Sequence, residues 1–254
     1  MAGDDALGTY VPDGDLRAVL KRVTGRQEDL DSLDAYLERR SAGAVPAPAR
    51  HVVLVVMESY EQWPMLPAWA SLGIADGLKG LAARGLWFDR FLPASDGTMH
   101  SLATILTGLP EAGLHTAQQP RSARPYSTSL PSAFSRLGFR TRLFYGGYLS
   151  WQRIGEFARA QGFEEVYGAA HMGEREQANE WGVPDEALFA FVLGRLDDSR
   201  PTFDVVLTTS FHPPFDIDVD AEGFPLASLP ADVRPRSSDA PNLRMLGHFW
   251  YADR

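Results

Sequence analysis

The sequence contains no cysteine, so disulfide bridges, thiolate metal ligands and cysteine nucleophiles are all excluded. It also lacks any stretch approaching ~18 uninterrupted apolar residues, the length that a membrane-spanning helix needs. Acids stand among the first seven residues, where a secretory signal has its basic region. We therefore expect the chain to be soluble and to carry no targeting segment of its own.

Basic residues are in the minority, with 24 Lys and Arg against 33 Asp and Glu and a formal net charge of −9. No run rich in Lys or Arg interrupts this balance, so a nucleic-acid-binding surface has no electrostatic basis. Nucleic acid is thereby excluded as a partner. The 254 residues are 44% hydrophobic and 22% charged, a composition typical of a globular protein with one sizeable core.

Two segments of different character follow one another along the chain. Residues 1–50 are polar, and we interpret them as a lead-in with one helix over 16–37 and a Pro- and Ala-rich linker over 41–50. From His51 onward, strand and helix signals alternate. Residues 51–254 are therefore predicted to form a separate domain.

The alternation in this second segment predicts a doubly wound α/β fold, with a mostly parallel sheet and flanking helices. The β-branched run VVLVVM (52–57) predicts a strand buried on both faces near the centre of the sheet. Further strands are predicted over 87–92, 140–145 and 201–211. Helices are predicted over a stretch ending at Gly85, over 129–137 and 151–160, and after a cap at Asp185.

Ligands of such sheets lie beyond the carboxyl ends of the strands, so residues just after each apolar run are the candidates for chemistry. Glu58 directly follows the first run, and its carboxylate is a suitable ligand for a hard divalent cation. The alternative is a solvated acid at a strand end.

Thr98 follows Gly97 and precedes an apolar-periodic stretch, which predicts that it lies at a helix N-terminus. A hydroxyl there, deprotonated beside a metal ion, would be placed to attack phosphorus while backbone N–H groups stabilise the developing charge. The alternative is a simple N-cap. His100 is a weaker candidate, because two residues further along a helix it points away from Thr98.

Two more places carry candidates for substrate binding. His212 follows the last predicted strand, and Pro213 and Pro214 fix the loop that presents it; the alternative is a polar surface histidine. Trp151 and Arg153 stand at a strand-to-helix transition, where an arginine clamps phosphate and a tryptophan forms a pocket wall. A packed tryptophan and a solvated arginine are the alternative for this pair.

Six segments, taken together in order, resemble the extracellular domain of the lipoteichoic acid synthase and phosphoglycerol transferase group, within the sulfatase and alkaline phosphatase superfamily. The resemblance covers residues 51–254, and its specificity lies in the combination rather than in any one segment. The segments are VVLVVMESY (52–60), DGTMHSLATILTGLP (96–110), LGFRTRLFYGG (137–147), GFEEVYG (162–168), WGVPDEALF (181–189) and VVLTTSFHPPF (205–215).

The resemblance implies roles for the candidates and an alkaline phosphatase-like fold. Glu58 maps to a metal ligand, and Thr98 maps to the metal-bound nucleophile. His212 maps to the residue that contacts the transferred head group, and Trp151 with Arg153 to the pair lining the glycerol-phosphate pocket. Gly146, Gly147 and Tyr148 occupy the place of an acid often found just before that pair.

The implied cofactor is a divalent metal, with Mn²⁺ the first choice and Mg²⁺ or Zn²⁺ as alternatives, and the implied substrate is a lipid or glycan head group. The group completes its metal site with an Asp-His pair, yet none of the six histidines here follows an Asp. We therefore expect residues 51–254 to be a partial catalytic domain that is inactive by itself. The full-length parent is expected to be membrane-anchored and to act on the extracytoplasmic face of the membrane or in the periplasm.

The sequence leaves two other functions open. One is a sulfuric ester hydrolase, although sulfatases of this superfamily use a modified Cys or Ser followed by Pro and Arg at alternate positions. The equivalent segment here reads Thr98-Met99-His100-Ser101-Leu102. The other is a non-catalytic remnant or binding module that keeps the pocket without the full metal shell.

Overall fold

The computed structural model describes residues 13–32, 35–36, 43, 49–89, 91–173, 179–196, 199–230 and 240–254. The chain divides into two compact units, Met1–Pro48 and Ala49–Arg254. Most of the predicted linker over 41–50 lies outside the described residues.

The helix predicted over residues 16–37 is wrong in length. Helix α2 spans Asp13–Thr24. Gly25 follows in the left-handed conformation with φ of 72°, and its N–H donates to the carbonyl oxygen of Lys21. A glycine in this conformation is the usual end of a helix, and residues 25–32 are not helical, whereas Ala35 and Tyr36 are helical again.

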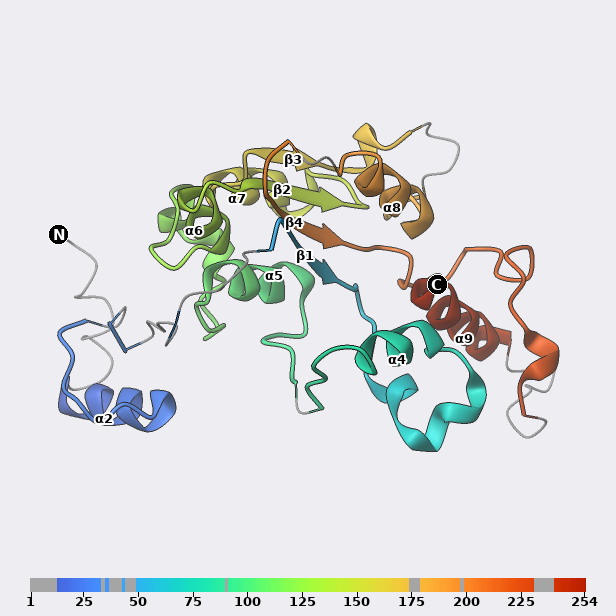
Figure 1. The fold of residues 1–254 in the computed structure, drawn as a ribbon, viewed down its shortest axis with the longest axis horizontal. Coiled ribbons are helices and arrows are strands. Elements are labelled where there is room, and N and C mark those ends of the chain that lie inside the picture. The colour runs from blue at the N-terminus through green and yellow to red at the C-terminus, as the bar shows by residue number, and fades with distance from the viewer. Residues whose placement is uncertain are drawn as a thin grey trace. The chain divides into compact units, whose positions relative to one another are not determined.

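The second unit is built on a four-stranded, entirely parallel sheet in the order β1-β4-β2-β3 (Figure 1). The doubly wound α/β fold is thereby confirmed. The strands are β1 (His51–Val56), β2 (Arg140–Tyr145), β3 (Glu165–Tyr167) and β4 (Thr202–Leu207). In register, Val56 of β1 and Tyr145 of β2 both lie opposite Leu207 of β4, so these three strands end at one edge.

The prediction that 52–57 is a central strand buried on both faces is wrong. Strand β1 lies at one end of the sheet, and its side chains Val53 and Val55 are 47% and 42% exposed. A β-branched run favours a strand, but it does not determine how many neighbours that strand has.

The strand predicted over 87–92 is also wrong, since the described residues there are in irregular structure. Phe88 and Phe91 are 71% and 73% exposed. Without a partner to pair its backbone groups, an apolar segment gains nothing from the extended ladder. Strand β3, which was not predicted, is only three residues long and pairs solely with β2 among the described residues.

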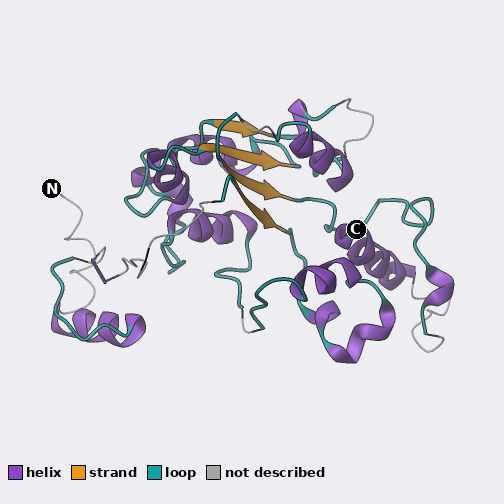
Figure 2. Cartoon of the chain, in the orientation of Figure 1, coloured by secondary structure: helices purple, strands orange, loops and turns teal. Residues whose placement is uncertain are grey.

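Helices cover the sheet on both faces (Figure 2). Helices α5 (Thr98–Thr107), α6 (Leu130–Arg136) and α7 (Ile154–Ala160) pack on the face that carries Leu143 and Val205. Helix α8 (Asp185–Leu193) packs on the opposite face, against Phe144 and Val206. Adjacent residues of a strand point to opposite faces, which explains why successive apolar residues fill two separate cores.

The predicted helices are found with adjusted ends. The helix expected to end at Gly85 is α4 (Asp76–Ala82), and the one predicted over 129–137 is α6, with Ser129 as its N-cap. The helix predicted over 151–160 is α7 preceded by a short 3₁₀ turn. The 3₁₀ turns are Trp63–Met65, Pro67–Leu72, Thr116–Gln118, Pro120–Ala123, Trp151–Arg153, Ala169–His171 and Leu226–Ser228.

A further hydrophobic core joins α9 (Ala240–Asp253) to the segment just before α4 and to the segments after β1 and β4, and includes the fully buried Phe249 and Ile74. The carboxylate of Asp253 accepts hydrogen bonds from the N–H groups of Gly77 (2.6 Å) and Leu78 (2.9 Å), so the end of α9 caps the start of α4. Within the parts of the chain just described, no helix has both the length and the apolar character needed to cross a membrane.

Candidate active site at the carboxyl edge of the sheet

Glu58 and Thr98, 40 residues apart in sequence, are in direct contact. The Thr98 hydroxyl donates to Glu58 Oε1 over 2.9 Å, and the Ser59 hydroxyl donates to the same oxygen over 3.0 Å. The Glu58 N–H in turn donates to Thr208 Oγ1 (3.0 Å), just beyond the neighbouring strand β4. The ends of β1 and β4 therefore hold the carboxylate at the threonine.

Thr98 is the first residue of α5, and Gly97 is the N-cap, without a side-chain cap. The alternative that Thr98 is only an N-cap is therefore wrong, because its hydroxyl bonds to Glu58 instead. The N–H groups in the first turn of a helix lack intrahelical partners and attract anions. The hydroxyl thus stands beside both a carboxylate and the N-terminus of a helix.

Tyr145, the last residue of β2, also belongs to this edge, and the sequence reasoning missed it. The pKa of Tyr145 is raised to about 12, mainly by burial and to a lesser extent by the negative charge of Glu58, so the side chain remains a neutral phenol. A Cβ atom on Gly147 would stand only 2.5 Å from the Tyr145 hydroxyl, so the glycine leaves room for the ring. The available signal was its place at the carboxyl end of an apolar run.

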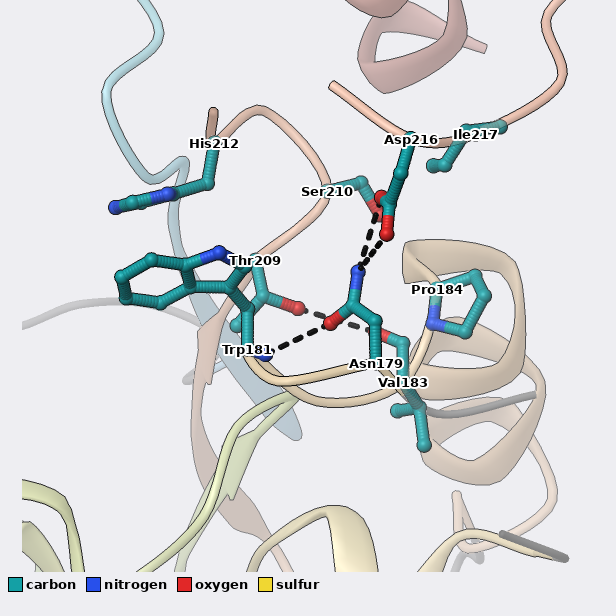
Figure 3. Close-up of a pocket in the computed structure, with 9 residues that line it drawn as sticks. All are labelled: Asn179, Trp181, Val183, Pro184, Thr209, Ser210, His212, Asp216 and Ile217. Atoms are coloured by element: carbon teal, nitrogen blue, oxygen red, sulfur yellow. Dashed lines mark hydrogen bonds between the residues drawn. The ribbon is translucent and has the colours of Figure 1, made fainter. Parts of the chain in front are cut away.

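A pocket lies beyond the end of β4 (Figure 3). The His212 ring lies against the Trp181 indole with centroids 3.6 Å apart, and its Nδ1–H donates to the Pro213 carbonyl oxygen over 2.7 Å. That bond leaves Nε2 as the nitrogen available to a ligand. The lining residues are Asn179, Trp181, Val183, Pro184, Thr209, Ser210, His212, Asp216 and Ile217.

Asn179 organises one wall of this pocket. Its Oδ1 accepts from the N–H groups of Trp181 (2.8 Å) and Gly182 (3.0 Å), and its Nδ2 donates to both carboxylate oxygens of Asp216. Gly182 has φ of 143°, and a Cβ there would lie 2.0 Å from the Gly146 carbonyl oxygen, so only glycine fits. No role could be predicted for Asn179, Gly182 or Asp216, because their approach depends on contacts between distant loops.

Asp185 has a different role from the helix cap that was predicted. It is the first residue of α8, and its Oδ1 accepts from the N–H groups of Thr209 (3.0 Å) and Ser210 (3.1 Å). Burial raises the pKa of this carboxyl group. Asp185 thus connects α8 to the loop that leads to His212.

Trp151 and Arg153 do not enter the contacts around Thr98. Trp151 packs against the core under α5, and the Arg153 guanidinium pairs with Glu156, with its side chain 78% exposed. Arg153 also has φ of 58°, a left-handed backbone that directs the chain into α7. The substrate-binding role that the resemblance implies for this pair stays a prediction.

The donor atoms at the carboxyl edge of the sheet are of a type that binds divalent cations. Glu58 and Thr98 supply two hard oxygen atoms 2.9 Å apart, a separation that adjacent ligands of one ion can adopt. Among the described residues, no two further His, Asp or Glu side chains join Glu58 in a three-ligand group. These two residues therefore provide part of a coordination shell.

The sequence from residue 50 to 227 matches the Sulfatase family. The chain belongs to the sulfatase family. The match covers both the edge with Glu58 and Thr98 and the pocket with His212, and so includes every predicted site residue.

Solved structures agree on the fold of this sulfatase-family chain. A protein of the alkaline phosphatase superfamily from Vibrio parahaemolyticus matches with a TM-score of 0.71 and 17% identity, over 96% of this chain and 58% of its own. The lipoteichoic acid synthase LtaP from Listeria monocytogenes matches with a TM-score of 0.65 and 21% identity, over 80% of this chain and 49% of its own. The Streptococcus pyogenes phosphoglycerol transferase GacH, in complex with sn-glycerol-1-phosphate, matches with a TM-score of 0.51 and 13% identity, over 79% of this chain and 53% of its own. The chain thus spans about half the length of these structures.

Proposed function

We propose that this chain is part of the catalytic domain of a metal-dependent phosphotransferase or hydrolase, which acts on phosphoglycerol- or phosphoethanolamine-type head groups through Thr98. The observation that carries the proposal is the hydrogen bond from Thr98 to Glu58 at the N-terminus of α5. Sulfatase-family membership and the likeness to two enzymes named as a lipoteichoic acid synthase and a phosphoglycerol transferase support it.

In the proposed reaction, Thr98 Oγ1 forms a bond to phosphorus while the bond from phosphorus to the leaving alcohol breaks, and that alcohol takes up a proton. An acceptor hydroxyl or water then attacks the phosphothreonine and releases Thr98. A divalent cation bound by Glu58 and Thr98, Mn²⁺ first and Mg²⁺ or Zn²⁺ as alternatives, would lower the pKa of the attacking hydroxyl.

The surrounding residues have separable tasks in this reaction. Glu58 accepts the Thr98 hydrogen bond and so fixes the direction of the hydroxyl. The first N–H groups of α5 would stabilise the phosphoryl oxygens, and His212 Nε2 would contact the transferred head group. From the resemblance to lipoteichoic acid synthases and phosphoglycerol transferases, we further propose that the parent protein acts on a lipid or glycan at the extracytoplasmic face of the membrane.

The test compares Thr98→Ala and Thr98→Ser in the intact protein, with a labelled phosphoglycerol lipid as donor. Thr98→Ala should lower turnover by at least about 10³-fold, because it removes the hydroxyl at the start of α5, and it should show no labelled peptide by mass spectrometry. Thr98→Ser keeps the hydroxyl and should retain activity and label. Substantial turnover by folded Thr98→Ala would refute the nucleophile, and turnover of sulfate esters alone would make the protein a sulfatase.

A further inference from the structure

A second group of ligand-type side chains lies near the start of α5, formed by His100, Glu111 and His115. One ligand atom from each of the three lies within 4.8 Å of the others. The two imidazole rings stack with centroids 4.0 Å apart and an interplanar angle of 15°. His115 Nδ1 stands 3.7 Å from Glu111 Oε1.

The carboxylate of Glu111 is built into the protein rather than solvated. Its side chain is only 9% exposed, and Oε1 accepts from the N–H groups of Gly113 (2.8 Å) and His115 (3.3 Å). Oε2 is buried and has no hydrogen-bond partner. Buried carboxylate oxygens are normally paired, so this atom indicates a missing positive partner.

The donor types indicate which cation would fill that place. Two imidazoles and one carboxylate match the three-ligand zinc sites of proteins, which leave a fourth position for water. Mg²⁺ and Ca²⁺ prefer oxygen ligands throughout and are poorly served by two nitrogens. The set therefore favours a zinc ion.

We propose that His100, Glu111 and His115 bind a zinc ion at a site separate from Glu58 and Thr98. His100 lies two positions after Thr98, about 200° around the helix, so the two side chains point to different sides. Its ring lies against the N-cap instead, since a Cβ on Gly97 would be 3.3 Å from His100 Nδ1.

Zinc binding requires a small rearrangement that the exposed histidine permits. Ligand atoms of a tetrahedral zinc ion lie about 3.3 Å apart, so the cluster has to contract, and the stacked rings have to turn until their nitrogens converge. The His115 side chain is 47% exposed and directly precedes the 3₁₀ turn Thr116–Gln118, so its ring has solvent space into which it can turn. The ion would then fasten the loop over 109–115 to the helix that presents Thr98.

The test is calorimetric titration of ZnCl₂ into the Glu58→Gln variant, in which the other candidate metal site is disabled. We expect one zinc ion per chain, and a rise in Tm on adding zinc that MgCl₂ does not reproduce. Adding His115→Ala or the isosteric Glu111→Gln should weaken zinc binding by about 100-fold and abolish that rise in Tm, since each removes one of three ligands. His171→Ala, which removes an exposed histidine elsewhere, is the matched control and should leave zinc binding unchanged.

Two results would overturn the site. One is the absence of zinc binding by folded Glu58→Gln protein. The other is equal zinc affinity in Glu58→Gln with and without His115→Ala and Glu111→Gln, with folding of each variant checked by far-ultraviolet circular dichroism. Neither result would test the proposed phosphotransferase activity, because that activity depends on Thr98.

Discussion

His212 is oriented by its immediate neighbours. Its Nδ1–H bond to Pro213 selects the tautomer, and the Trp181 indole supports one ring face. The backbone N–H of Trp181 is itself held by the side chain of Asn179. A histidine fixed in this way pays little conformational entropy on contacting a phosphoryl group, which favours a role in the reaction over that of a surface side chain.

His212→Ala in the intact protein should therefore lower kcat by about 10²-fold, because it removes one positioned donor to the transferred group. Metal affinity should be unchanged. Steady-state kinetics together with metal titration checks both statements. If the variant lost metal and kept its turnover per bound metal, His212 would be a ligand instead.

At this scale the sequence predicts part of the candidate site. Glu58 and Thr98 could be predicted because each directly follows or starts an element, and parallel strands end at one edge. Trp181 and Asn179 could not be given a role, since their position depends on Gly182 meeting Gly146, a contact between loops far apart in sequence. Local patterns do not encode such contacts.

At the scale of elements, the centre of the sheet contains a buried ion pair. Arg142 of β2 and Asp204 of β4 lie opposite each other in the register and form two hydrogen bonds of 2.6 and 2.8 Å, with side chains 1% and 0% exposed. Thr202 donates a further bond to Asp204, and Arg142 another to the Arg195 carbonyl oxygen. This network aligns β2 with β4, and so places Tyr145 beside the end of β4.

Asp204→Ala should destabilise the protein by about 3–5 kcal/mol, because it leaves the Arg142 guanidinium buried without its counter-charge. Urea unfolding followed by circular dichroism measures the change. Arg153→Ala, which breaks an exposed pair with Glu156, serves as the control and should have no measurable effect. Equal effects of the two substitutions would show that the buried pair contributes no more than the exposed one.

The elements also show where sequence patterns stop being informative. Strands β2 and β4 each include polar residues and are buried inside the sheet, whereas the more continuously apolar β1 lies at the end of the sheet. The segment 87–92 contains Trp87, Phe88 and Phe91, yet its described residues form no strand. Whether an apolar run is paired depends on which other segments reach it, and that is a property of the whole chain.

At the scale of the domain, α9 is connected to the loop after His212 by His248. This buried histidine donates from Nδ1 to the Arg244 carbonyl oxygen (2.7 Å), while Nε2 accepts from the Ile217 N–H (3.1 Å). Burial lowers the pKa of His248 below 6.5, although Asp216 and the Arg244 carbonyl act in the opposite direction. The bond from Ile217 requires the neutral ring, because a protonated Nε2 no longer accepts, whereas the Nδ1 bond to Arg244 is kept in either state.

The protein should lose stability on acidification through this residue. The unfolded chain binds the proton more tightly than the folded one, so the contribution is present above pH 6.5 and is lost as the pH falls below it. Urea unfolding over this pH range should show a steeper decline for the wild type than for His248→Gln. Parallel declines would show that other groups determine the acid response.

The position of β1 at the end of the sheet has a consequence for hydrogen exchange. Its carbonyl oxygens at Arg50 and Val56 accept from Thr202 and Thr208, so the even-numbered residues face β4 and the odd-numbered ones face away. Among the described residues no strand covers that outer side, so the amide protons of Val53 and Val55 should exchange with deuterium far faster than that of Leu54. One strand thus contains two classes of amide, and the slow class reports on the pairing that holds Glu58 beside Thr98.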